Sequence, residues 1–477
     1  MVFSSISFLF YFLPIALGLY FLAPGKIKNL VLLIASLFFY AWGEPAYVLL
    51  MIVSIFLNYG AGRLIAARRN RISLSLGIAA NLLILGFFKY ADFLTGTLNS
   101  LFSLGLPELD LPLPIGISFY TFQAMSYLVD LYRKDAKLQT NLIDFAAYIA
   151  MFPQLIAGPI VRLRSIEDKL HSRTHTLNGF ARGARRFAVG LGKKVLIANN
   201  IGAVWDQVSA SDLTQLPVLT AWIGIAAFTL QLYFDFSGYS DMAIGLGKMF
   251  GFDFPENFRH PYESRSITEF WRRWHITLGS WFREYVYIPL GGNKKGLKRQ
   301  LLNIFIVWML TGLWHGASWN FVLWGLFFGV FLLLEKVWLL KRLEKIPRVL
   351  THLYAIVIVM ISWVIFSIEE PGSIAAYLKA MFGFGGGLAD TGSLYLLTSN
   401  LILFIIAAVG CTHFPAALGR FLIKDRERGK HSRIDESELG VSGIGVILQN
   451  LWTLALLLAS TGFIIASTYN PFLYFRF

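Results

Sequence analysis

Residues 260–325 of the chain read HPYESRSITEFWRRWHITLGSWFREYVYIPLGGNKKGLKRQLLNIFIVWMLTGLWHGASWNFVLWG, and this stretch decides the fold. Its first half is basic, rich in tryptophan, and carries His275. Its second half is an apolar run that starts at Leu301 and ends on His315. An ionisable side chain is expensive to keep in a segment built for lipid, so His315 is a candidate functional residue by default.

The residues after Ser266 predict an amphipathic helix. Ser266 and Glu269 have the spacing of a capping box, which opens a helix. Arg272 and Arg273 lie off its apolar face, so we expect a helix in the plane of the inner leaflet, with its arginines toward lipid headgroups. His275 lies at the edge of this face, where a histidine satisfied by a carbonyl is an open alternative to a functional one. Apolar side chains recur every three or four residues, at Ile267, Phe270, Trp274, Leu278, Trp281 and Tyr285.

The composition of the 477-residue chain is that of a membrane protein. It is 56% hydrophobic and 15% charged, whereas soluble domains carry about 25% charged residues. The net charge of +14 is explained by cytoplasmic loops, which collect Lys and Arg, so no nucleic-acid partner is expected. The single cysteine, Cys411, excludes an internal disulfide and a multi-cysteine zinc site.

Apolar segments of spanning length recur along the chain. They predict an all-α, polytopic integral membrane protein with about a dozen transmembrane helices. The first apolar run lacks the basic start and the cleavage site of a signal peptide, so we expect a retained span. No soluble domain separates, so residues 1–477 are expected to form one membrane domain. The predicted spans are 6–22, 30–42, 46–62, 72–88, 113–131, 187–204, 216–234, 301–317, 319–338, 352–368, 395–412 and 443–467.

Charge placement predicts the sidedness of these spans. When the N-terminus is placed outside and the spans alternate, almost all basic residues between them fall on the inner face, as the positive-inside rule requires. Only Lys89, Lys379 and Arg476 fall on the other face. Both termini are therefore expected to be extracytoplasmic.

Two apolar stretches do not fit as ordinary spans. Residues 142–161 have basic loops on both sides and contain Pro153 and Pro159, which break helices. A re-entrant hairpin buried in protein is favoured, and a kinked span is the alternative. Residues 234–258 hold Asp235 and Asp241 among apolar neighbours, so they are expected to line a cavity or the inner surface.

The depth of His315 supports a role in chemistry. A helix that begins at Leu301 and rises about 1.5 Å per residue carries His315 roughly 20 Å into a core of about 30 Å. A neutral imidazole there can act as a general base, although a histidine that joins two helices by a hydrogen bond is equally open. Gly316 leaves room for a substrate or another backbone. No metal site is expected, and the HxxxH spacing of His171 and His175 lies in a polar loop.

Motifs along nearly the whole chain resemble one family. They include Phe3-Ser4-Ser5, Pro153-Gln154-Leu155-Ile156-Ala157-Gly158-Pro159 and Asp235-Phe236-Ser237-Gly238-Tyr239-Ser240-Asp241. The most specific are Trp274-His275, the run REYVYIPLGG at 283–292, and Gly312-Leu313-Trp314-His315-Gly316, all within residues 263–319. The chain resembles the membrane-bound O-acyltransferases (MBOAT), in the branch of the alginate and peptidoglycan O-acetyltransferases. Glu284 stands where relatives more often have Asp.

The resemblance implies an MBOAT fold, a helical funnel in the bacterial cytoplasmic (inner) membrane. It implies an O-acyltransferase with His315 as the essential residue and His275 as the second family histidine. An acyl group, expected to be acetyl from acetyl-CoA, would pass outward to a polysaccharide such as alginate or peptidoglycan, with an extracytoplasmic SGNH-type partner completing the transfer. No bound cofactor is expected. The supporting residues we expect are Trp274, Arg272, Arg273, Arg283, Trp314, Gly316 and Asp235.

Several alternatives stay open. D-alanyl transfer to teichoic acid would use the same chemistry, while a polysaccharide or lipid transporter or a non-catalytic scaffold would not need His315. The C-terminal run NPFLYFRF resembles the tails of acyl-transferring relatives, and Tyr474 is a candidate acyl carrier. An aromatic anchor at the membrane interface is the alternative for Tyr474.

Overall fold

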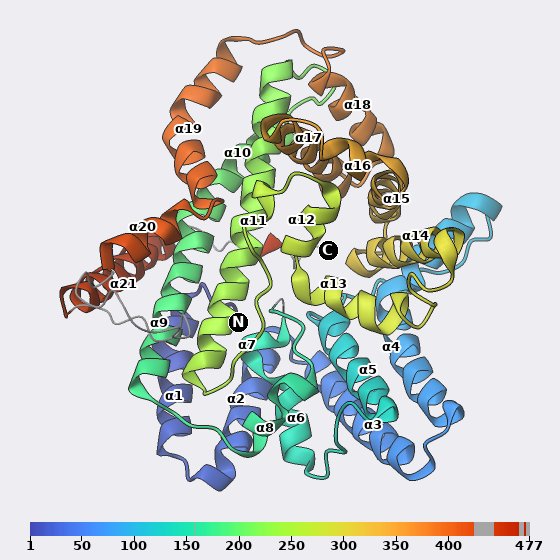
Figure 1. The fold of residues 1–477 in the computed structure, drawn as a ribbon, viewed down its shortest axis with the longest axis vertical. Helices are drawn as coiled ribbons and strands as arrows, with labels where there is room; N and C mark the ends of the chain where they lie inside the picture. Colours follow the sequence, from blue (N-terminus) through green and yellow to red (C-terminus); the bar gives the residue numbers. More distant parts are fainter. Residues whose placement is uncertain (157, 424–442, 467–471, 474–477) are drawn as a thin grey trace.

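The computed structural model describes residues 1–156, 158–423, 443–466 and 472–473, and this part of the chain is helical without any strand (Figure 1). Helices satisfy their own backbone hydrogen bonds, which is what an apolar chain needs in lipid. Eight helices of the described residues are long and apolar enough to cross a membrane, and Ser7–Leu22 is a shorter apolar helix. The predicted all-α membrane fold is confirmed, and the figure of about a dozen spans stays a prediction.

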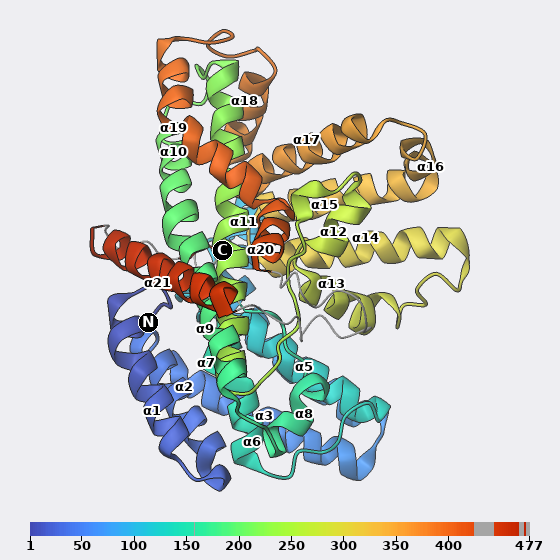
Figure 2. The same ribbon diagram turned by 60° about the vertical axis from the view of Figure 1, so that its left-hand side comes forward.

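Helices α1 to α8 gather at one end of the molecule (Figures 1 and 2). The elements of the first half are η1 (Ser7–Phe12), α1 (Leu13–Leu22), η2 (Gly25–Ile27), α2 (Lys28–Gly43), α3 (Tyr47–Arg68), α4 (Arg71–Phe102), α5 (Ile117–Arg133), α6 (Leu142–Ala150), α7 (Phe152–Leu155), α8 (Leu163–His171), α9 (Leu177–Gly192), η3 (Lys193–Ala198), α10 (Asn199–Ser209) and α11 (Val218–Met249).

Helices α15 to α19 lie toward the opposite end (Figures 1 and 2). The elements of the second half are η4 (Pro261–Glu263), α12 (Ile267–Arg273), α13 (Ile276–Phe282), η5 (Arg283–Tyr287), α14 (Gly296–His315), α15 (Trp319–Leu334), η6 (Glu335–Leu339), α16 (Leu340–Leu343), α17 (Arg348–Ser367), α18 (Pro371–Met381), α19 (Thr391–Gly410), α20 (Phe414–Ile423) and α21 (Gly443–Ala466).

Helix α11 forms the centre of the molecule and packs along α9, η3 and α10 (Figure 2). Glycines allow this close approach: a Cβ on Gly190 of α9 would lie 2.5 Å from the carbonyl oxygen of Gly238 in α11. The helix continues past Asp235 to Met249 because its carboxylates are paired. Asp241 accepts from Lys193 and Arg186, each at 2.7 Å. The predicted polar lining is also present, since Ser237, Ser240 and Asp241 are among the residues that line a pocket of about 220 Å³.

The stretch predicted to be re-entrant is a buried, broken helix. Helix α6 ends at Ala150, and the short α7 follows from Phe152. The ring of Pro153 is incompatible with a continued helix, so the break precedes it. Side chains take up the freed backbone groups: the Ser36 hydroxyl accepts from the N–H of Phe152 at 3.0 Å, and the Gln154 amide donates to the carbonyl of Tyr148 at 2.5 Å.

Helices α14 and α15 form a tight antiparallel pair. Gly312 and Gly325 face each other, and a Cβ on Gly312 would lie 2.4 Å from the carbonyl oxygen of Phe321. Helices α12 and α13 lie between this pair and α11 (Figure 1). The His315 end of α14 is therefore placed beside the junction of α12 and α13, where His275 lies.

Candidate active site

The predicted single amphipathic helix is two short helices with His275 between them. Helix α12 ends at Arg273 and α13 begins at Ile276. His275 has a φ of +44°, in the left-handed region that non-glycine residues rarely occupy. The break is held by a neighbouring loop, because the N–H of Ile276 donates to the carbonyl of Asn257 at 2.9 Å. The continuous helix expected from apolar spacing was wrong here, because spacing does not report such tertiary hydrogen bonds.

The start of α12 is fixed by two caps. Ser266 accepts from the N–H of Glu269 at 3.0 Å, which is half of the predicted capping box. The Glu269 carboxylate accepts from the N–H of Arg265 instead of Ser266. A buried carboxylate at the start of η6, directly after α15, completes the cap: Glu335 accepts from the N–H groups of Ile267 and Thr268 at 2.7 and 2.8 Å. A negative group at a helix N-terminus is stabilising, so Glu335 locks α12 to α15.

The ring of His275 is oriented by Asn257. The Nδ1 atom of His275 lies 3.1 Å from Oδ1 of Asn257, and the Thr277 hydroxyl donates to the same oxygen at 2.8 Å. The Nδ2 of Asn257 donates to Ser240 at 3.1 Å. This network makes Oδ1 the acceptor, so Nδ1 of a neutral His275 carries the proton and Nε2 keeps its lone pair. Nε2 is buried and has no hydrogen-bond partner among the described residues.

The two predicted histidines meet at Trp314. The ring centroid of His275 lies 6.0 Å from that of Trp314, and His315 lies 5.1 Å from it, both at steep interplanar angles. His315 also packs edge-on against Trp324 at 4.9 Å and Phe366 at 5.5 Å. Only 6% of its surface is exposed. The structure therefore brings together two residues that are forty positions apart in the chain, with one indole as their common neighbour.

Two side chains of α4 hold the end of α14. Lys89 donates to the carbonyl oxygens of Trp314 and His315, and the hydroxyl of Tyr90 donates to that of Leu313 at 2.6 Å. The last carbonyls of a helix have no partner inside it and carry partial negative charge, which a buried ammonium stabilises. Sequence reasoning did not propose Lys89 as a site residue. Its only signal was that it is a lysine on the wrong side for the positive-inside rule.

A pocket of about 510 Å³ leads to His275. It lies between α12, α13, α14 and the segment from the end of α15 to α16, and apolar side chains such as Trp271, Leu278 and Val307 form much of its wall. We call it the donor pocket, because we propose below that it binds the acyl donor. Among the described residues that line it are three basic side chains and no acidic one. The basic residues are Arg272, Arg283 and Lys336, of which the first two were predicted from sequence.

Other predicted residues have different surroundings. Trp274 is buried against Phe258 and Trp363, with ring centroids 5.1 and 5.2 Å away. Arg273 lies outside the lining of the donor pocket and pairs with Glu269 at 2.7 Å. The room beside Gly316 is filled by the ring of Phe321, whose Cε2 would lie 2.1 Å from an added Cβ. The close approach at Gly316 is therefore made by a side chain of the neighbouring helix.

Asp235 anchors the end of the chain. Its carboxylate pairs with Lys194 and accepts from the N–H of Leu473 at 2.8 Å. The ring of Phe472 packs on Tyr239 at 4.5 Å, one helical turn along α11 from Phe236, which contacts the His275 ring at 4.7 Å. Tyr474, the predicted carrier, lies outside the described residues. No group of three His, Cys, Asp or Glu side chains that could hold a metal occurs within the described part.

The described part of the chain is an all-helical membrane body with a histidine at the buried end of an apolar helix and a basic pocket beside a second histidine. A pocket with such surroundings is a candidate active site. The chain belongs to the membrane-bound O-acyltransferase (MBOAT) family, whose sequence profile matches residues 125–369. The protein is therefore a membrane-embedded O-acyltransferase, as the sequence predicted.

Several known proteins are similar to this chain over its full length. The chain is 42% identical to the probable alginate O-acetylase AlgI of Azotobacter vinelandii over 501 residues, which covers all of both chains. It is 42% identical to the protein of the same name from Pseudomonas putida over 489 residues, again covering all of both. It is 34% identical to the peptidoglycan O-acetyltransferase of Helicobacter pylori, covering 100% of this chain and 98% of that one.

Proposed function

We propose that the protein transfers an acetyl group from a cytoplasmic thioester, acetyl-CoA, toward hydroxyl groups of an exported or cell-surface polysaccharide. The observation that carries this proposal is the donor pocket, because its three basic residues and apolar wall suit an anionic acyl-CoA. The relatives similar over their full length are named for O-acetylation of alginate and of peptidoglycan, and we propose an acceptor of this class.

In the proposed mechanism, His315 acts as the general base. It takes the proton of the attacking hydroxyl as the hydroxyl oxygen bonds to the thioester carbonyl carbon, and the proton then passes to the departing thiolate as the C–S bond breaks. Lys89 and Tyr90 hold the helix end that carries His315. His275, with Nε2 as an acceptor beside the pocket, lies on the donor side. N–H groups near Trp314 and Gly316 are proposed donors to the oxyanion.

The direction of transfer follows from the proposed sidedness. Arg272, Arg283 and Lys336 lie on segments that the positive-inside rule assigns to the cytoplasm, in the bacterial inner membrane. The acyl group would leave on the other side, where an SGNH-type partner completes transfer to the polysaccharide. Tyr474 is the proposed carrier of the acyl group between the two. The N–H of Leu473, the residue before Tyr474, donates to Asp235 of α11 at 2.8 Å, which supports this proposal.

The experiment uses sealed membrane vesicles of known orientation that contain the protein and its partner. Radiolabelled acetyl-CoA is supplied to one face, and alginate or peptidoglycan fragments to the other. We expect alkali-labile acetate on the polysaccharide only when acetyl-CoA meets the cytoplasmic face. Equal labelling from either face would contradict the sidedness. Labelling with a D-alanyl carrier protein and not with acetyl-CoA would replace acetyl by D-alanyl as the group that is moved.

A further inference from the structure

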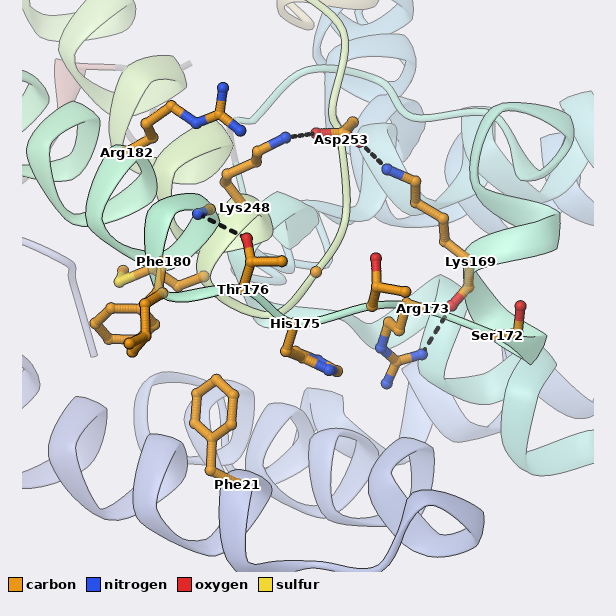
Figure 3. A pocket seen from close by; sticks show the side chains of 15 residues that line it. Phe21, Lys169, Ser172, Arg173, His175, Thr176, Phe180, Arg182, Lys248 and Asp253 are labelled. Carbon is orange, nitrogen blue, oxygen red and sulfur yellow. Dashed lines mark hydrogen bonds and ion pairs between the residues drawn. The ribbon is translucent and has the colours of Figure 1, made fainter. Parts of the chain in front are cut away.

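A second pocket has a volume of about 740 Å³, and Figure 3 shows the side chains that line it. Neither His275 nor His315 is among its lining residues. Its walls come from three parts of the chain: the end of α1, the segment from the end of α8 through the first turns of α9, and the end of α11 with the turn that follows. None of these parts contributes to the donor pocket. A pocket of this size holds a small ligand or a lipid headgroup.

The lining is strongly basic. Lys169, Arg173, Arg182 and Lys248 line it, and Asp253 is the acidic residue among the described lining residues. Asp253 pairs with both lysines, as Figure 3 shows, so the two lysines share one carboxylate. An excess of positive charge in a concave site attracts anions.

Arg173 is fixed in place at the pocket and has donor capacity left over. Its Nε donates to the hydroxyl of Tyr20 at 2.7 Å, and its Nη1 donates to the carbonyl of Lys169 at 3.0 Å. The guanidinium carbon lies 4.5 Å from the ring centre of Phe252. Its Nη2 is buried without a hydrogen-bond partner among the described residues. A buried donor with no partner is costly, and an immobilised guanidinium is the group best suited to phosphate oxygens.

The N-terminus of α9 adds to the positive potential of the pocket. Thr176 caps this sixteen-residue helix by accepting from the N–H of Gly179 at 3.0 Å, and both residues line the pocket. The positive end of the helix is therefore directed at the cavity. The far wall closes through a turn at Gly251, whose φ is +86° and where an added Cβ would lie 3.2 Å from the His175 ring.

Exposed apolar side chains stand next to these charges. Phe21 is 41% exposed and Leu177 is 91% exposed, and both line the pocket. Basic and exposed apolar groups side by side match a ligand with an anionic head and an apolar part.

We infer that this pocket binds a phosphate group, held by Arg173, Arg182, Lys248 and the N-terminus of α9. The phosphate belongs either to the headgroup of an anionic phospholipid in the adjacent leaflet or to a soluble phosphate compound. The site is separate from acyl transfer, so the inference does not depend on which acyl donor or acceptor the protein uses.

The test titrates the purified full-length protein in detergent and follows its thermal stability. One arm adds phosphatidylglycerol, a second adds a glucosyl diacylglycerol with the same acyl chains but no phosphate, and a third adds inorganic phosphate. The variant Arg182→Gln/Lys248→Gln is compared with wild type and with Lys137→Gln/Lys345→Gln, which removes the same charge from exposed residues elsewhere. Arg182→Gln alone, at an exposed position, serves if the double variant does not fold.

We expect either phosphatidylglycerol or inorganic phosphate to bind wild type and the Lys137/Lys345 variant with equal affinity. The same ligand should bind the Arg182/Lys248 variant about tenfold more weakly. Such a difference with phosphatidylglycerol, and not with the glucosyl lipid, identifies a headgroup site. The same difference with inorganic phosphate identifies a soluble ligand. Equal half-saturation in the two double variants for both phosphate ligands, or no saturable effect on wild type, overturns the inference.

Discussion

The ammonium group of Lys89 lies 3.2 Å from the main-chain oxygen of His315. Lys89 is buried in α4, and Tyr90 beside it donates to the same last turn of α14. The end of α14 that carries His315 is therefore held by two side chains of another helix, the amine of Lys89 and the hydroxyl of Tyr90. A helix C-terminus that ends inside the protein needs such partners.

Lys89→Met keeps the length of the side chain but removes its charge and hydrogen bonds. A hydrogen bond to a charged group is worth about 1.5–3 kcal/mol, so its loss at a positioning residue lowers kcat by roughly 10- to 100-fold. KM for acetyl-CoA should not change, because Lys89 is not part of the donor pocket lining. Steady-state kinetics measure both values, and Lys379→Met, at an exposed position, is the control. A purely structural lysine would lower protein abundance and leave kcat per folded molecule unchanged.

Removing one cation from the donor pocket should weaken donor binding. We expect Arg272→Gln or Arg283→Gln to raise KM for acetyl-CoA roughly three- to tenfold, since both residues are partly solvated and screened. The increase should shrink at high salt. Lys137→Gln, an exposed residue away from the pocket, should leave KM unchanged. A KM that is equal in all these variants at low salt would show that the donor binds elsewhere.

Gly312→Ala should destabilise the pair of α14 and α15. The new Cβ would lie 2.4 Å from the carbonyl oxygen of Phe321, so the backbones must separate. Overpacking of this kind costs about 1–3 kcal/mol. The melting temperature of the purified protein measures the loss. Gly329→Ala on the same hairpin is the matched control, because its nearest neighbour is 3.6 Å away. Similar melting temperatures for the two variants would argue against a close contact at Gly312.

We expect the ion pairs of the Glu284 carboxylate with two arginines to be sensitive to acid. Arg162 lies 2.7 Å from it and Arg164 contacts the same oxygen. Partial burial alone would raise the pKa of Glu284, but the hydrogen bond and charge of Arg162, followed by those of Arg164, lower it below its ordinary value of 4.5. A carboxyl group whose pKa is lowered by folding stabilises the fold fully when the pH is above its ordinary pKa. This stabilisation is lost as the pH falls through the pKa of the folded state.

The stability difference between wild type and Glu284→Gln should therefore be full above about pH 4.5 and shrink below it. Melting temperatures of the two proteins between pH 7 and pH 4 measure this difference. A difference that grows as the pH falls would have the wrong sign for a stabilising ion pair.

Local pattern was enough to predict the helices, while the roles of His275 and His315 in catalysis stay predictions. Apolar runs that must satisfy their own backbone can only be helices in lipid, so each predicted span coincides with a helix for most of its length. Arg272 and Arg283, expected from the sequence on the donor side, line the donor pocket, and their role there stays a prediction. Local pattern failed at His275, where Asn257 from a separate loop interrupts the helix.

Residues that act across large sequence distances were beyond sequence reasoning. Glu335 caps α12 from sixty-seven or more positions away, and Lys89 reaches α14 across more than two hundred. Neither residue can be recognised from its neighbours in the sequence. A single carboxylate or lysine next to an apolar run is equally typical of a helix that ends at the membrane surface. The extension of α11 to Met249 was hidden for the same reason, because the partners of Asp241 lie on α9 and η3.

The measurement that tests the central claim most directly compares cells that carry wild-type protein, His315→Ala or His413→Ala, with equal amounts confirmed in the membrane. His413 is an exposed histidine far along the chain and serves as the matched control. Acyl ester on the cell-surface polysaccharide is then quantified. We predict that His315→Ala loses the ester while His413→Ala keeps it. Wild-type ester levels in the His315→Ala cells would show that His315 is a packing residue and would contradict its role in acyl transfer.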